Sequence, residues 1–129
     1  MKYLGIDFGL RKIGLAVSEG ELASPWQILA VKGFSDAIEK TSQIIKEGNF
    51  EKIIIGLPEG KMGQVVKGFV NALKKNGIDV ETADETLSSK KGLKAMIKAG
   101  IGVKNRRNED AFSAAGILQD YLDSRDLPL

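Results

Sequence analysis

The stretch YLGIDFGLRKIGLAV, residues 3–17, decides the fold of this chain. Residues 3–6 are mostly apolar, Asp7 and Gly9 interrupt the run, and apolar side chains then alternate with small ones over residues 13–17. Alternation with a period of two is typical of a β-strand, and a polar, glycine-containing break is typical of a turn. The stretch therefore predicts a β-hairpin with Asp7 at the end of its first strand.

Beyond the hairpin, strand patterns and helix patterns alternate. The expected elements are a strand over 26–31, which opens at Pro25, a helix over 37–45 capped by Ser35 or Asp36 and stopped at Gly48-Asn49, and a strand over 53–55. A helix over 65–73 closed by Asn76-Gly77, a strand over 78–82, a helix from Ser88 or Ser89 to Ala99 and a last helix from near Asn108 follow, with a tail frayed from Ser124. Strands joined by single helices pair in parallel through crossovers. The sequence thus predicts a mixed α/β sheet of five strands, three antiparallel and then two parallel.

Composition limits the chemistry that is available to the chain. The 129 residues fit one domain, 43% of them are hydrophobic, and neither cysteine nor histidine occurs. Disulfides, zinc sites of Cys and His, and Ser-His-Asp triads are therefore excluded, so catalysis must use carboxylates, Lys, Ser, Thr or Tyr. Asp7 falls where a signal peptide would need its apolar part, and no apolar run reaches spanning length. We expect a cytoplasmic protein without a membrane segment.

Three acidic positions can meet at one edge of the expected sheet. Asp7 ends an apolar strand, Asp84-Glu85 follows the last strand, and Asp110 begins the last helix beside small alanines. Ligands of open α/β sheets bind at the carboxyl ends of the strands. Each acid alone also has a structural explanation: a turn cap for Asp7, and helix-dipole complementation for the other two, which outweighs a ligand role for Asp84-Glu85 taken in isolation.

Together, these carboxylates predict a site for a hard cation. Carboxylate oxygens suit Mg²⁺ or Mn²⁺, and the chain offers no softer ligand. Such ions support phosphodiester hydrolysis without any histidine.

Positive charge marks the nucleic-acid contacts that we expect. Between Lys90 and Arg107 no acid interrupts the basic residues, and three lysines recur every four residues along the expected helix. Solvated surface lysines are the commoner explanation of such a stripe. The residues we expect at the nucleic acid are Gly9, Arg11 and Lys12 in the hairpin turn, and Ser88, Ser89, Lys90, Lys94, Lys98, Arg106 and Arg107.

Four segments together resemble the YqgF (RuvX) family of Holliday junction resolvases and pre-16S rRNA nucleases. They are GIDFGLRKIGLAVSE, IIIGLPEGKMG, ADETLSSKKGLKAMIKAG and EDAFSAAGILQDYL, and the resemblance runs from residue 3 to residue 122. It implies an RNase H-like fold, a mixed five-stranded sheet with helices on both faces. It also implies metal-dependent phosphodiester cleavage.

The resemblance also assigns roles to the acids. Asp7 corresponds to the family's first-strand aspartate. Glu85, with Asp84 beside it, corresponds to the acid of the family's Asp-Glu-Arg-Leu-Ser/Thr motif. Asp110 corresponds to the aspartate of the family's last helix. These three are the expected catalytic metal ligands. Thr86 stands where that motif has arginine, and the segment after Leu57-Pro58 is shorter than usual; both differences bear on how substrate is gripped.

The leading hypothesis is an Mg²⁺- or Mn²⁺-dependent nuclease that acts on structured RNA or branched DNA, either at the 5′ end of pre-16S rRNA or at Holliday junctions. A non-catalytic nucleic-acid-binding or regulatory protein of the same fold is the alternative. An actin-like ATPase is a third reading of Asp7-Phe8-Gly9, but its cleft needs two such domains and this chain has room for one. The chain would be a monomer or a homodimer, and a symmetric dimer would favour a two-strand junction cut.

Overall fold

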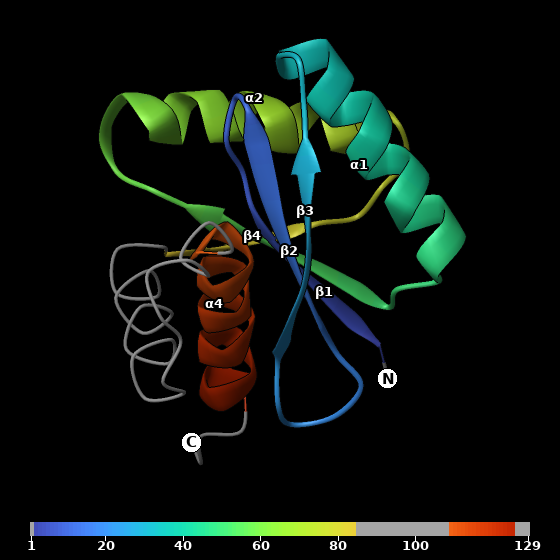
Figure 1. Ribbon diagram of the computed structural model, residues 1–129, viewed down its shortest axis with the longest axis vertical. Helices are drawn as coiled ribbons and strands as arrows, with labels where there is room; N and C mark the ends of the chain where they lie inside the picture. The colour runs from blue at the N-terminus through green and yellow to red at the C-terminus, as the bar shows by residue number, and fades with distance from the viewer. Residues whose placement is uncertain (1, 85–108, 126–129) are drawn as a thin grey trace.

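A computed structural model describes residues 2–84 and 109–125 of the chain (Figure 1). The elements are β1 (Tyr3–Asp7), β2 (Lys12–Ser18), β3 (Ser24–Ala30), α1 (Phe34–Gly48), β4 (Lys52–Leu57), α2 (Gly60–Lys75), β5 (Glu81–Asp84) and α4 (Glu109–Arg125). The strands form one sheet in the order β3-β2-β1-β4-β5. β1, β2 and β3 pair antiparallel, and β4 pairs in parallel with both β1 and β5. The predicted mixed five-stranded sheet is confirmed.

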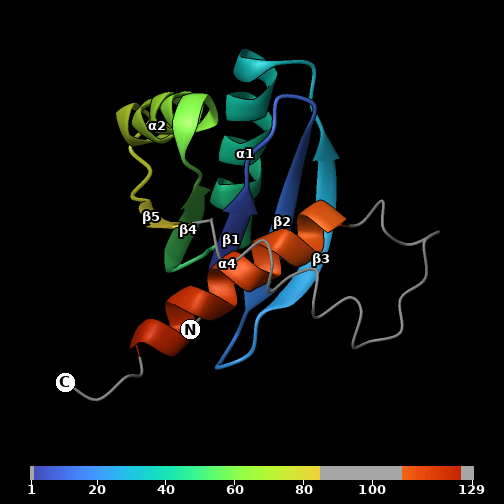
Figure 2. The ribbon, with the colours of Figure 1, turned by 90° about the vertical axis from the view of Figure 1, so that its left-hand side faces the viewer.

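Different helices cover the two faces of this sheet (Figure 2). Helices α1 and α2 pack over one face, on a core that includes Leu4 and Ile6 of β1. Helix α4 packs over the other face, on a smaller core that includes Tyr3. Alternation along β1 sends Leu4 and Ile6 to the first face and Tyr3, Gly5 and Asp7 to the second. Asp7 therefore belongs to the face that α4 covers.

The start of α1 corrects the predicted cap. Gly33 holds the N-cap position and no side chain caps the helix, so Ser35 and Asp36 lie inside the first turn. The Asp36 carboxylate reaches back and accepts a hydrogen bond from the main-chain N–H of Lys32 at 2.8 Å. The predicted stop is confirmed, because Asn49 closes the helix in the left-handed conformation with φ 52°.

Two other boundaries differ from the prediction. β5 begins at Glu81, and the apolar residues just before it, Ile78 and Val80, are buried in the larger core instead of pairing with a strand. Helix α4 continues through Ser124 to Arg125, past the residue at which the tail was expected to begin. The helix expected from Ser88 or Ser89 to Ala99 lies outside the described residues. Within 2–84 and 109–125, no helix is long and apolar enough to cross a membrane.

Candidate active site at the end of strand β1

Asp7 is the last residue of β1 and is half-buried. In the antiparallel register it lies directly opposite Gly14 of β2. Its carboxylate stands where the strand leaves the core and the turn to β2 begins. Burial of an ionised group in this way requires polar or cationic partners.

Gly14 brings the start of α4 onto the same part of the sheet. A Cβ atom at Gly14 would collide with the main-chain oxygen and carbon of Asp110 and stand 2.8 Å from the nitrogen of Ala111. Gly5 makes a second close contact, since a Cβ there would stand 2.8 Å from the carbonyl oxygen of Ala114. These two glycines remove the side chains that would otherwise hold the helix away from β1 and β2. The first turn of α4 therefore sits beside Asp7.

Asp7 and Asp110 line one open pocket of about 430 Å³. The rest of its wall is the turn between β1 and β2, which contributes Phe8, Gly9, Leu10, Arg11 and Lys12. Both aspartates are half-buried, whereas Arg11 and Lys12 are exposed. The pocket thus combines two carboxylates with two cationic side chains that solvent can reach.

Gly9 has a structural role in this turn. A Cβ atom at Gly9 would stand 2.5 Å from the carbonyl oxygen of Lys12, so the turn closes tightly on itself at that point. The main-chain oxygen of Arg11 accepts a hydrogen bond from the N–H of Val31 at 2.9 Å, which ties the turn to the end of β3. The backbone of the turn is therefore fixed, while the Arg11 and Lys12 side chains extend into solvent.

The donor atoms of the pocket fit a hard divalent cation. Asp7 and Asp110 supply only carboxylate oxygens, which Mg²⁺ and Mn²⁺ prefer, and Mg²⁺ commonly uses one or two protein carboxylates together with water and phosphate oxygens. Within 2–84 and 109–125, no three acidic side chains gather closely enough to hold a metal. The third expected ligand, Glu85, lies outside these ranges, as do Ser88, Ser89, Lys90, Lys94, Lys98, Arg106 and Arg107.

Asp84 lies at the same edge of the sheet, two strands away from Asp7. It is exposed and pairs with Leu57 at the end of β5. Leu57 packs against the larger core, so the strand register assigns Asp84 to the face of α1 and α2. Asp84 and Asp7 therefore belong to opposite faces.

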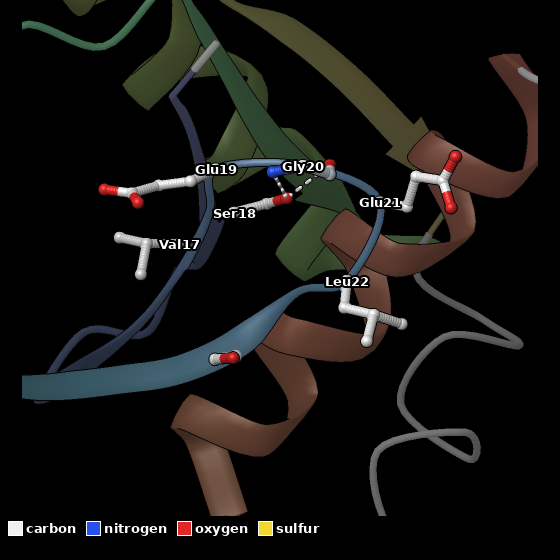
Figure 3. Close-up of a pocket in the computed structure, with 7 residues that line it drawn as sticks. Val17, Ser18, Glu19, Gly20, Glu21 and Leu22 are labelled. Carbon is white, nitrogen blue, oxygen red and sulfur yellow. Dashed lines mark hydrogen bonds between the residues drawn. The ribbon is translucent and has the colours of Figure 1, made fainter.

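A pocket larger than that of Asp7 and Asp110 lies elsewhere. About 580 Å³ in volume, it is formed by the loop from β2 to β3, beside α4 (Figure 3). The Oγ of Ser18 donates to the carbonyl oxygen of Gly20 at 2.8 Å and accepts from its N–H at 3.3 Å. This hydroxyl is therefore used within the loop itself, and the remaining polar side chains of the pocket, Glu19, Glu21 and Ser24, are exposed.

Sequence reasoning missed two features of the site. Gly14 enters the hairpin pattern only as a small residue, and Gly5 is not singled out at all, although glycine in a strand is a recognised sign of close backbone approach. Leu10, 47% exposed, lines the pocket between the acids and the basic pair and was not singled out. Nothing in the local pattern distinguishes Leu10 from an ordinary turn residue.

Comparison with known proteins gives matches over nearly the whole chain. The family described as RuvX, Holliday junction resolvase, matches residues 1–124. A protein of Clostridioides difficile named "Putative pre-16S rRNA nuclease" is 35% identical over 132 residues, covering 95% of this chain and 94% of the relative. A protein of Syntrophomonas wolfei with the same name is 34% identical, covering 98% and 97%.

A solved structure supports the fold independently. The RuvC protein of T. thermophilus, in complex with a Holliday junction substrate, superposes with a TM-score of 0.64 at 16% identity, covering 97% of this chain and 95% of that one. The RNase H-like fold expected from the sequence is therefore confirmed.

Proposed function

Because the chain belongs to the RuvX family of Holliday junction resolvases, we propose that it is a divalent-metal-dependent nuclease that hydrolyses phosphodiester bonds in structured nucleic acid. The observation that carries the proposal is the shared pocket of Asp7 and Asp110. Two carboxylates from opposite ends of the chain meet there beside exposed cations. Such a combination suits a metal-bound phosphate better than a neutral substrate.

Asp7 and Asp110 would hold Mg²⁺ or Mn²⁺, and Glu85 would complete the ligand set. When bound, such ions activate water and stabilise the leaving oxygen of a phosphodiester. Arg11 and Lys12 would contact phosphate groups on either side of the scissile bond, and the fixed backbone of the turn would hold these contacts in register. The basic residues from Lys90 to Arg107 would extend the contact along the strand.

The substrate would be the 5′ end of pre-16S rRNA or a Holliday junction in the cytoplasm. The relatives above are named for a pre-16S rRNA nuclease, and the family is described as a Holliday junction resolvase. Cutting a junction symmetrically requires two matched active sites, so that activity calls for a homodimer, whereas trimming an RNA end can be done by a monomer.

Cleavage assays with Mn²⁺ test the proposal on two labelled substrates, a 16S rRNA precursor with its 5′ leader and a four-way DNA junction. Wild-type protein should cut one of them, Asp7→Asn should lose at least about a hundredfold in rate, and EDTA should abolish cutting. Asp79→Asn, an exposed acid outside the pocket, is the matched control and should leave the rate unchanged. Tight binding of both substrates without cleavage would instead identify a binding or regulatory protein.

A further inference from the structure

Trp26 occupies an unusual position on the edge strand β3. It is the only tryptophan of the chain, and its side chain is 45% exposed. The pairing of β2 and β3 shifts at this point: Leu15 lies opposite Gln27 and Ala16 opposite Pro25, so Trp26 is the extra residue of a β-bulge. Bulges redirect side chains and are often found beside functional sites.

The bulge directs Trp26 into a small aromatic and cationic cluster. The rings of Trp26 and Phe50 have centroids 6.2 Å apart and are tilted by 58°. The Lys2 Nζ lies 4.8 Å from the centroid of the Phe50 ring. The ring of Phe50 fills the space that a side chain at Gly48 would occupy. Phe50 is thus held in place between Lys2 and Trp26.

A pocket of about 250 Å³ adjoins this cluster, lined by Lys2, Trp26, Gln27, Ile44, Glu47 and Gly48. It therefore offers an aromatic surface, an ammonium group, an amide and a carboxylate. The carboxylate is positioned by Gln43, whose Nε2 donates to an oxygen of Glu47 at 3.1 Å.

Protection of the sheet edge does not account for this tryptophan. Pro25 cannot donate a ladder hydrogen bond, and the bulge already twists the edge away from a pairing partner. Proteins usually protect an edge strand with charged side chains, whereas an exposed indole adds an apolar surface that favours association.

We propose that this pocket binds an unpaired nucleobase, which stacks on Trp26 while Lys2 contacts its phosphate. Stacking on aromatic side chains beside a positive charge is how proteins hold single strands, and the amide and carboxylate can hydrogen-bond a base edge. A peptide partner fits less well, because four of the six lining residues would present it with polar groups or no side chain.

The pocket lies at the opposite end of β1 from Asp7. Lys2 precedes Asp7 by five positions, which corresponds to roughly 17 Å of extended strand. By the alternation along β1, Lys2 lies on the face of α1 and α2, where α1 also lines the pocket, whereas Asp7 lies on the face of α4. A nucleic-acid strand cut at Asp7 would therefore have to pass around the β3 edge of the sheet to place a base on Trp26, several nucleotides from the scissile bond. This inference takes its ligand class from the proposed nuclease function, and it adds that the substrate has an unpaired flank.

Intrinsic fluorescence tests the site directly, because Trp26 is the only emitter of its kind. Single-stranded and fully duplex oligonucleotides of the same sequence are titrated in EDTA, so that no cleavage occurs. Single strands should quench the emission and duplexes should not. The affinity of each variant is measured by fluorescence anisotropy of a labelled single strand. Trp26→Leu should bind about 5- to 100-fold more weakly than wild type, whereas Trp26→Phe should bind within a few-fold of it. Leu22→Ala changes an exposed residue elsewhere and should bind like wild type.

The outcomes separate this inference from the proposed function. Binding that leaves the emission unchanged and is equal in Trp26→Leu would overturn the base pocket while leaving the nuclease intact. Quenching by single strands in a protein that cuts nothing would support the pocket and reject the nuclease. Equal quenching by single strands and duplexes would show that no unpaired base is recognised, and would also overturn the pocket.

Discussion

The main chain of Asp110 lies directly on Gly14, with no room between them for even a methyl group. Gly14 in turn pairs with Asp7 across β1 and β2. The contact therefore determines how close Asp110 of α4 lies to Asp7 of β1. It couples packing between helix and sheet to the geometry of the pocket.

Gly14→Ala should damage both stability and activity. The added methyl group must push the first turn of α4 away from the sheet, and overpacking of this kind costs about 1–3 kcal/mol of unfolding free energy. Displacing Asp110 by about 1 Å should lower the cleavage rate further, by on the order of a hundredfold. Thermal unfolding and Mn²⁺-dependent cleavage measure the two effects.

Gly20→Ala is the matched control, since a Cβ atom there meets nothing within 4 Å. It should leave both the melting temperature and the rate near wild type. If Gly14→Ala were equally harmless, the close approach of α4 would not position Asp110.

Asp110→Asn should weaken metal binding without unfolding the protein. A ligand present at a hundred times its Kd stabilises the folded state by about 2.7 kcal/mol, so Mn²⁺ should raise the melting temperature of wild type measurably. Loss of one of the carboxylate ligands should remove most of that increase. Asp123→Asn, an exposed aspartate near the end of the same helix, should keep it. An undiminished increase in Asp110→Asn would place the metal elsewhere.

The hairpin and its aspartate could be predicted because their signals are local. The period of two, the polar break and the position of Asp7 all lie within residues 3–17, and the division into antiparallel and parallel strands followed from the alternation of strands and helices. The role of Gly14 could not be predicted in the same way. Its importance comes from its contact with α4, which lies far away in the sequence, and the residues next to Gly14 give no sign of that contact.

The predicted caps show a second limit. Asp36 has the residue type of an N-cap, but its carboxylate bonds the N–H of Lys32, before the helix. In a single sequence, an aspartate at the N-cap cannot be distinguished from an aspartate in the first helical turn whose side chain bonds an N–H before the helix. Trp26 was similarly assigned to a regular strand, since a bulge depends on the register of the partner strand.

Asp36 should make stability depend on pH. The N–H of Lys32 and, to a lesser extent, the Lys40 ammonium 3.2 Å away hold the pKa of this carboxyl below its ordinary value of 3.8. A lowered folded pKa means that the stabilisation is present above about pH 3.8 and is lost as the pH falls through the folded value. Asp36→Asn should therefore melt below wild type at pH 7, and the two should converge at the acid end of that window.

Glu39→Gln, an exposed acid of the same helix, controls for general loss of negative charge. Its difference from wild type should change less with pH than that of Asp36→Asn. A constant difference for Asp36→Asn from pH 7 to pH 2 would mean that the carboxylate's charge contributes nothing and that only its shape matters.

Arg11 and Lys12 should each contribute one phosphate contact. Neutralising a side chain that contacts phosphate releases fewer counterions on binding, so Arg11→Gln and Lys12→Gln should each reduce the slope of log K against log salt concentration by about 0.9 on duplex DNA. Affinity should fall similarly for all sequences, because phosphates carry no sequence information. Lys75→Gln, at the exposed end of α2, should leave the slope unchanged. If all three variants behaved alike, the cations beside Asp7 would belong to the general surface charge, and the scissile strand would have to approach the carboxylates from another side of the pocket.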